Sequence, residues 1–398
     1  MNWETLRADE YCIAVKDGTH DTPKPVDFGY KLVTGKHVKN GQIDSSSAYY
    51  ISEEDYNAIN KRSMVERWDV IMSMIGTVGE AAVVKNDPDY AIKNVALFKC
   101  GGSEVRGKWL CYYLNSPEGK GKMLGEIKGS SQQFLSLKQL RELPIMFSEE
   151  KVPRIVEIIS NYDDLIENNQ KQIKLLEDAA QRLYKEWFVN LRFPGHENTK
   201  IVDGVPEGWR KSTVSEVSAV LRRGISPKYN EKARGIVINQ KCIRQTIVSY
   251  DEARTQEKKY PAELEIVESD IVICSTGAGT LGRVGQIFEA KGNATLDSHV
   301  TLIRANEKIG QQSLFWSLKM QQDYLMSAGK GSTNQLELSR ETIGNCKILI
   351  PEQKIAEQAE KNFVAIHNKM KECSMQIARL REARDLLLPK LMSGEVEV

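Results

Sequence analysis

The chain has 398 residues, of which 41% are hydrophobic and 27% are charged, and its formal net charge is +1. These values are typical of a globular protein with two or three domains, and they exclude a disordered chain or a uniformly basic one. Because the sequence has no apolar stretch of membrane-spanning length and no signal peptide pattern at its start, we expect a cytoplasmic protein.

The first part of the chain, residues 1–148, mixes short apolar runs with a helical stretch. Runs at Ile71, 83–84 and 95–98 are rich in β-branched residues and indicate strands, whereas GKWLCYYLNS at 107–116 favours a helix. This mixture predicts an α+β domain.

Residues 149–191 show a different pattern, in which apolar residues recur at alternating spacings of four and three. This spacing is the heptad repeat of a coiled-coil helix, and Pro153 marks its first turn. The predicted seam comprises Ile155, Ile159, Tyr162, Ile166, Asn169, Ile173, Leu176, Ala180, Leu183 and Trp187. The polar Asn169 either fixes the register of the helix or occupies a tolerated position at the solvent edge.

A linker at 192–208, punctuated by prolines and glycines, leads to a second α+β region at 209–350. Apolar runs at 236–238, 271–273 and 300–303 indicate strands, and QSLFWSLKMQQDYL at 312–325 favours helix. A second heptad series then fills 351–393. Its members are Ala359, Phe363, Ile366, Met370, Cys373, Ile377, Leu380, Arg384, Leu387 and Leu391. Arg384 interrupts this seam and is a candidate contact for a partner.

The two halves of the chain repeat each other about 200 residues apart, which is the signature of a duplication. Trp3 and Trp209 open the two copies, and the matched segments are TPK and SPK, VTGKHVKN and INQKCIRQ, DVIMSMIGTVG and DIVICSTGAGTLGRVG, NVALFK and HVTLIR, and KGSSQQFLSL and KGSTNQLELS. We therefore expect two similar globular domains and two long helices that pair as an antiparallel coiled coil, with pseudo-twofold symmetry.

The second copy contains Gly277-x-Gly279-x-x-Gly282, which has the spelling of a dinucleotide-binding turn. The first copy keeps only part of it, and RVGQIFEAKG after Gly282 has the pattern of a strand, whereas that motif needs a helix. The pattern predicts a strand-turn-strand corner in both copies.

The whole chain resembles the specificity (S) subunits of type I restriction-modification systems. The resemblance rests on DGTHDTPKP at 17–25, the paired KGSSQQFLSL and KGSTNQLELS, WFVNLRFPGHE at 187–197, VPEGW at 205–209, and the terminal IPEQKIAEQ and LLLPKLMSGEVEV. The first helix departs from the pattern, because MFSEEKVPRIVEII lacks the Pro-Glu-Gln start of the second.

The resemblance implies two target-recognition domains that read the halves of a bipartite, asymmetric double-stranded DNA site, with the helical pair as a ruler for the unread spacer. It also implies a non-catalytic chain that directs two methyltransferase (M) subunits and restriction/translocase (R) subunits. S-adenosylmethionine, ATP and Mg would then belong to those partners. The sequence is consistent with a non-catalytic chain, since no complete aminomethyltransferase, nuclease or Walker motif occurs. The scattered cysteines and histidines also suggest no metal site.

Polar residues repeated in both copies are the candidate DNA contacts. They are Lys36, Lys39, Lys128, Ser131 and Gln133 in the first copy, and Lys241, Arg244, Lys330, Thr333, Asn334 and Gln335 in the second, with Arg222 and Arg223 added as a basic pair of the second copy alone. Lys and Arg suit phosphates or guanine, and Asn and Gln suit adenine. The alternatives are a solvated strand edge for the lysines, a polar turn capping strands at Leu135 and Leu336, and a free surface pair for the arginines. At the level of function, the alternative is a coiled-coil scaffold with duplicated protein-binding domains.

Overall fold

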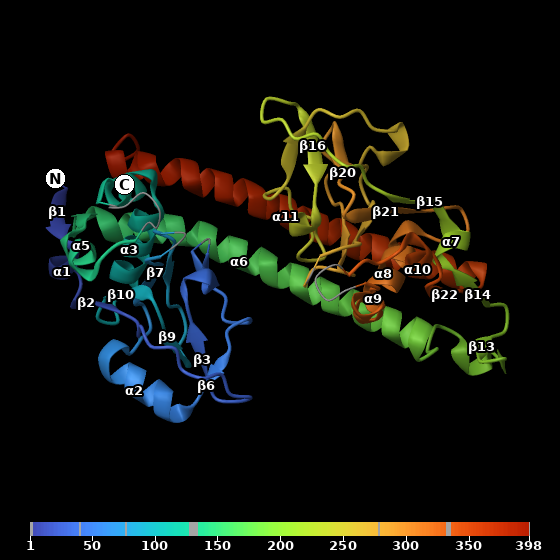
Figure 1. Ribbon diagram of the computed structural model, residues 1–398, viewed down its shortest axis with the longest axis horizontal. Helices are drawn as coiled ribbons and strands as arrows, with labels where there is room; N and C mark the ends of the chain where they lie inside the picture. Colours follow the sequence, from blue (N-terminus) through green and yellow to red (C-terminus); the bar gives the residue numbers. More distant parts are fainter. Residues whose placement is uncertain are drawn as a thin grey trace. The chain divides into compact units, whose positions relative to one another are not determined.

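The computed structural model describes residues 3–39, 41–75, 78–126, 134–277, 279–331 and 336–397 (Figure 1). The chain forms two compact units. Unit 1 comprises Met1–Glu167 and Ile377–Val398, and unit 2 comprises Asn168–Gln376. Each unit therefore contains part of each of the two long helices.

The described part of unit 1 has a four-stranded sheet in the order β2-β10-β7-β8 and a three-stranded sheet in the order β6-β3-β9, with two smaller strand pairs, β1-β11 and β4-β5. The strands are β1 (Glu4–Arg7), β2 (Ala14–Asp17), β3 (Tyr30–Val33), β4 (Val38–Lys39), β5 (Gln42–Ile43), β6 (Tyr50–Ile51), β7 (Val70–Ser73), β8 (Ala81–Val83), β9 (Tyr90–Ile92), β10 (Val95–Lys99) and β11 (Pro144–Phe147). The helices are α1 (Ala8–Tyr11), α2 (Glu53–Ser63), α3 (Glu104–Asn115), α4 (Pro117–Glu126), α5 (Leu137–Glu142) and the first part of α6 (Lys151–Tyr184).

The described part of unit 2 repeats this plan, with a sheet in the order β15-β21-β18-β19, a sheet in the order β17-β16-β20, and the pairs β14-β22 and β12-β13. The strands are β12 (Ile201–Val202), β13 (Val205–Pro206), β14 (Arg210–Thr213), β15 (Ser218–Arg223), β16 (Gly235–Ile238), β17 (Arg254–Gln256), β18 (Ile271–Cys274), β19 (Val284–Gln286), β20 (Ala294–Leu296), β21 (Val300–Ala305) and β22 (Lys347–Ile350). The helices are α7 (Val214–Val217), α8 (Gln311–Met320), α9 (Gln322–Ser327), α10 (Arg340–Gly344) and α11 (Gln353–Ser393), whose last part belongs to unit 1.

The pairing of strands confirms the internal repeat. In unit 1, β3 runs parallel to β9, and in unit 2, β16 runs parallel to β20. The central strands β7 and β18 are buried along their whole length, which explains their unbroken apolar sequence. The α+β class that the sequence predicts is confirmed.

The segment around the three glycines forms the expected corner. Strand β18 pairs antiparallel with β19, and the element that follows Gly282 is this strand β19, where a dinucleotide-binding turn would have a helix. Gly277, Gly279 and Gly282 adopt positive φ angles of 102°, 76° and 75°. A side chain at Gly282 would also overlap the backbone of Leu325 in α9. The glycines therefore serve the turn and its packing.

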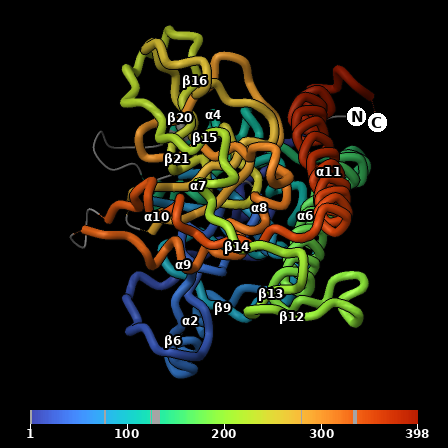
Figure 2. Tube along the Cα trace, turned by 90° about the vertical axis from the view of Figure 1, so that its right-hand side faces the viewer, coloured from blue at the N-terminus to red at the C-terminus, as the bar shows by residue number. Residues whose placement is uncertain are grey.

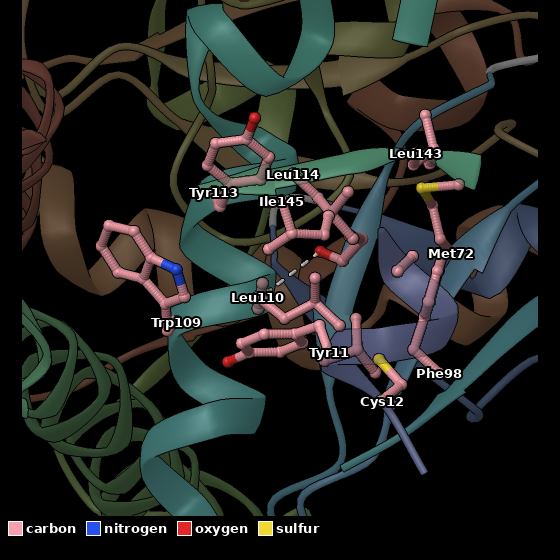
Figure 3. Packing of buried hydrophobic residues seen from close by; sticks show 14 of the residues in the cluster. Tyr11, Cys12, Met72, Phe98, Trp109, Leu110, Tyr113, Leu114, Leu143 and Ile145 are labelled. Carbon is pink, nitrogen blue, oxygen red and sulfur yellow. Dashed lines mark hydrogen bonds between the residues drawn. The ribbon is translucent and has the colours of Figure 1, made fainter. Parts of the chain in front are cut away.

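The core of unit 1 lies between α3 and the four-stranded sheet (Figure 3). Trp109, Leu110, Tyr113 and Leu114 of α3 are buried in it. The polar tips of the two aromatic residues are satisfied, because Trp109 Nε1 donates to the Met146 carbonyl at 2.6 Å and the Tyr113 hydroxyl donates to the Pro144 carbonyl at 2.8 Å. These bonds hold α3 against β11.

Within each unit, α6 and α11 run in opposite directions (Figure 2). In unit 1, Ile155 shares a core with Leu391, and Asp163, further along α6, binds Arg384, earlier in α11. In unit 2, the Cys373 thiol donates to Gln172 Oε1 at 3.6 Å, while Ala180, further along α6, shares a core with Phe363. All twenty predicted seam positions are buried or half-buried.

The segment expected as a linker has structure of its own. It contains the hairpin β12-β13, and Phe193 is buried against the Trp209 ring at 4.7 Å between centroids. Among the described residues, no helix combines the length and apolar character that a bilayer crossing requires.

Candidate nucleic-acid interface

Lys36 lies on a tight turn that follows a parallel strand in unit 1. Strand β3 runs into the 3-10 turn Gly35–His37, in which Lys36 is exposed and His37 is buried beneath it. The Thr34 backbone N–H donates to His37 Nδ1 at 2.8 Å. Burial, and then the nearby charge of Lys36, lowers the pKa of His37, so this ring is neutral at pH 7. The turn thus places Lys36 in solvent, and the buried His37 below it adds no positive charge.

Unit 2 repeats this arrangement around Lys241. Strand β16 runs into the 3-10 turn Gln240–Cys242, in which Lys241 is exposed and Cys242 is buried. The side chain of Asn239 accepts from the Lys241 backbone N–H at 2.8 Å. The structure shows no ion pair or side-chain hydrogen bond for Lys36 or Lys241 within the ranges it describes. Both ammonium groups are therefore available to an anion.

We call the turns Gly35–His37 and Gln240–Cys242 the lysine turns, and the carboxyl-terminal ends of the central strands β7 and β18 the strand exits. In each unit the strand exit lies beside the lysine turn. In unit 1, a side chain at Gly35 would lie 3.4 Å from Ser73 Cβ, at the end of β7. In unit 2, a side chain at Gly277 would lie 2.6 Å from Gln240 Oε1, and the Cys274 thiol donates to the Gln240 carbonyl at 3.9 Å. The lysine turn and the corner after the strand are consequently adjacent in both units.

The residues that follow the polar segments lie against the same strand ends. In unit 1, Ile75 pairs antiparallel with Phe134, and in unit 2, Thr276 pairs antiparallel with Glu337. We call the surface formed by the lysine turn, the strand exit and this returning strand the strand-exit surface of each unit. It comprises 35–37, 74–75 and 134–135 in unit 1, and 240–242, 275–277, 330 and 337–338 in unit 2.

Helices begin shortly after the polar segments in both units. Ser136 caps α5 by accepting from the Gln139 N–H, and Ser339 caps α10 by accepting from the Thr342 N–H. The polar turn expected before Leu135 and Leu336 lies outside the described residues, and the β-bridges at Phe134 and Glu337 lie next to these two leucines. The matching caps also show that Phe134 corresponds to Glu337, since unit 2 has one more residue in this segment than the ungapped alignment assumes.

The remaining predicted contacts differ in their surroundings. Lys39 is exposed on β4, and Lys330 is exposed where its backbone pairs with that of Glu337. Arg244 is exposed, but its Nε donates to the Lys241 carbonyl at 3.1 Å and its guanidinium lies 3.5 Å from Glu252. Six predicted contacts lie outside the described residues: Lys128, Ser131, Gln133, Thr333, Asn334 and Gln335.

Arg222 and Arg223 on β15 both have acidic partners within unit 2, so they do not form a free basic pair. Arg222 pairs with Glu263. Arg223 lies 2.7 Å from Glu337 and donates to the carbonyls of Leu338 at 3.0 Å and Ser275 at 3.4 Å. Arg223 therefore links the end of β18 to the backbone at 337–338. Its position in the sequence of β15 gives no indication of these contacts.

A buried ion pair recurs at the start of the central strand of each unit. Asp69 pairs with Lys99 at 2.7 Å, and Asp270 pairs with Arg304 at 2.6 Å. Burial raises the pKa of Asp69 despite the opposing effect of Lys99. These carboxylates are part of the framework of the sheet. Within the described ranges, no group of three His, Cys, Asp or Glu side chains is placed to hold a metal ion.

A family model described as the type I restriction modification DNA specificity domain matches residues 206–371. The chain is 27% identical over 374 residues to the type I restriction enzyme MjaIX specificity subunit of Methanocaldococcus jannaschii, covering 88% of this chain and 84% of that protein. It is 25% identical over 349 residues to the type I restriction enzyme HindI specificity subunit of Haemophilus influenzae, covering 69% of this chain and 74% of that protein.

Among solved structures, the chain resembles the crystal structure of the S subunit of a type I restriction-modification system from M. genitalium. The TM-score is 0.55 at 17% sequence identity, and the match covers 98% of this chain and 96% of that one. At this identity the likeness shows a common fold.

Proposed function

Because this chain belongs to the family of type I restriction-modification specificity subunits, we propose that it selects the DNA sequence on which its partner subunits act. Subunits of this family are non-catalytic. The observation that carries the proposal is the repeated strand-exit surface, where an exposed lysine without a described partner lies beside the strand exit in each unit. Such lysines suit phosphate contacts.

The DNA site is bipartite and asymmetric in this proposal. Each unit carries one strand-exit surface, so each reads one half of the site. The two surfaces share their framework and differ in their exposed residues, since Ile75 and Phe134 of unit 1 correspond to Thr276 and Glu337 of unit 2. Two halves with different base sequences follow from this difference.

The helical pair sets the length of the unread spacer. Two features support this role: α6 and α11 pass uninterrupted through the boundaries between the units, and they pack antiparallel within each unit. The target-recognition domains are 1–148 and 209–350, the helices are 149–191 and 351–393, and 192–208 connects the first helix to the second domain.

The chemistry belongs to partners. Two methyltransferase subunits supply adenine methylation with S-adenosylmethionine, and restriction subunits supply translocation and cleavage with ATP and Mg. The framework role of Asp69 and Asp270 fits this division, because their carboxylates are engaged by Lys99 and Arg304.

Methylation sequencing tests the proposal. The chain is expressed together with its methyltransferase partner in a host that lacks other DNA methylation, and the genome is read by single-molecule sequencing. We expect methyladenine at a two-part motif with a spacer of constant length. A continuous motif, or a motif that is unchanged when this chain is replaced by another specificity subunit, would contradict the proposal.

A further inference from the structure

The strand-exit surfaces of the two units differ at one pair of facing residues. In unit 1 the pair is Ile75 and Phe134, and in unit 2 it is Thr276 and Glu337. Residues directly opposite each other in an antiparallel pair project their side chains to the same face. Ile75 and Phe134 therefore form one apolar patch.

This patch is exposed to solvent. Ile75 is 45% exposed and Phe134 is 51% exposed. The patch lies next to the lysine turn, because a side chain at Gly35 would be 4.0 Å from the Ile75 carbonyl oxygen. The backbone that carries this patch thus adjoins the turn that carries Lys36, on the surface proposed to meet DNA.

The fold itself does not require apolar residues here, as unit 2 shows. The Thr276 hydroxyl lies 2.6 Å from His299 Nδ1, and the Glu337 carboxylate lies 2.7 Å from Arg223. The same backbone pairing is therefore formed with polar side chains that have polar partners. The apolar pair of unit 1 is a local property of that unit.

We propose that Ile75 and Phe134 recognise thymine methyl groups in the major groove of the half-site read by unit 1. This inference rests on the proposed function and adds a base preference to it. The C5-methyl of thymine is the apolar feature of the major-groove base edges, and aromatic and aliphatic side chains contact it. Lys36, on the adjoining turn, reaches a neighbouring phosphate and orients the patch.

Thymine-to-uracil substitution isolates this contact, because it removes the methyl group and keeps the base pairing. Each thymine of the site identified by methylation sequencing is replaced singly by uracil, and binding is measured with the full complex of this chain and its methyltransferase subunits. We expect at least one uracil to weaken binding about fourfold, the value for one buried methyl group. Phe134→Ala should remove this difference between thymine and uracil, and Phe134→Leu should preserve it.

Phe28→Ala is the matched control, because it removes another aromatic side chain of unit 1, 84% exposed and outside the strand-exit surface, and should leave the same uracil effect intact. The inference is overturned if the wild-type complex binds its site selectively but no thymine shows a methyl effect that depends on Phe134. It is also overturned if Phe134→Ala prevents assembly with the methyltransferase in the absence of DNA, since the patch would then contact protein. Failure of the wild-type complex to distinguish its site from other DNA would instead refute the proposed function.

Discussion

At the residue scale, the structure distinguishes basic side chains that are available to bind DNA from those that are engaged in contacts within their own unit. Lys36 and Lys241 extend from turns whose neighbouring residues, His37 and Cys242, are buried. Arg223, by contrast, donates its hydrogen bonds to carbonyls of its own unit. Lys36 and Lys241 are thus better candidates for DNA contacts than Arg223, because their charges have no partner among the described residues.

Removing Lys36 or Lys241 tests this distinction. Lys36→Ala and Lys241→Ala should each weaken cognate DNA binding and lower the slope of log K against log salt by about one, because each lysine neutralises about one phosphate. A salt titration of binding by the assembled complex gives both values. The controls are Lys61→Ala and Lys232→Ala, which remove exposed charges of the same units at positions that are not part of the strand-exit surfaces. Equal slopes for all four variants would rule the turn lysines out.

His367 makes the stability of unit 2 depend on pH. It is 4% exposed on α11, where Nδ1 lies 3.1 Å from Gln286 Oε1 and the ring packs on Phe288. Burial lowers its pKa to about 4, and the smaller effects of Glu268 and Lys371 oppose each other. The unfolded chain binds this proton more readily, so the stability that the neutral ring contributes is present above about pH 6.5 and is lost as the pH falls toward 4.

Between pH 7 and pH 5 this histidine should cost about 2 kcal/mol of unfolding free energy. Denaturant unfolding at the two pH values measures the loss. His367→Gln, which does not titrate, should show a smaller loss over the same interval. His37, whose pKa burial also lowers, titrates in both proteins and does not enter the difference. Identical losses would show that His367 is not the group responsible.

At the element scale, Arg384 changes the interpretation of the second seam. The sequence suggests that this arginine contacts a partner, but its Nη1 donates to Asp163 of α6 at 2.7 Å. The Tyr112 hydroxyl of α3 donates to the other oxygen of the same carboxylate, also at 2.7 Å. One charged group therefore joins both helices and the globular part of unit 1.

Breaking this interaction should destabilise unit 1. Arg384→Ala leaves Asp163, whose side chain is 21% exposed, without its cation, and we expect a loss of about 2 kcal/mol in unfolding free energy. Asp163→Ala and the double variant complete the cycle, in which the coupling should exceed about 1 kcal/mol. Lys369→Ala is the comparison, because Lys369 and Glu372 form an exposed pair on one helix that contributes under about 0.5 kcal/mol. Additive effects of the two single changes would show that the pair does not couple the helices.

At the scale of the whole molecule, the duplication places equivalent surfaces in two units joined by continuous helices. The unit boundaries cut α6 after Glu167 and α11 after Gln376. Residues added near these points lengthen both helices without altering the residues inside either globular part. The proposed spacer role can therefore be tested separately from base reading.

Seven residues inserted after Asn169 and seven more after Gln376 should lengthen the spacer by about three base pairs, because seven helical residues add about 10 Å. Seven also preserves the heptad pattern, so the seam stays in register. Methylation sequencing of a host with the doubly extended chain should show the same two half-sites further apart. Insertion in α6 alone serves as the control. It should abolish or reduce methylation, because the two helices then differ in length and cannot pair along their whole length. An unchanged spacer in the doubly extended chain would refute the ruler.

The amino-acid sequence alone establishes the features that depend on local order. The repeat of about 200 residues, the heptad series and the strand-turn-strand corner depend on residues that are near one another along the chain or recur at a regular period. The incomplete glycine pattern of the first copy argues against a nucleotide-binding turn from residue order alone. Helices such as α3 and α8 follow from the same local patterns.

Tertiary packing decides which distant residues meet. Arg384 and Asp163 are 221 positions apart, and neither heptad series specifies that they pair. The contact of Gln240 with the glycine corner, the pairing of Phe134 with Ile75, and the capture of Arg223 by Glu337 likewise depend on how strands and turns pack. Such contacts depend on the three-dimensional packing of the whole unit, so periodicity along the chain carries no information about them.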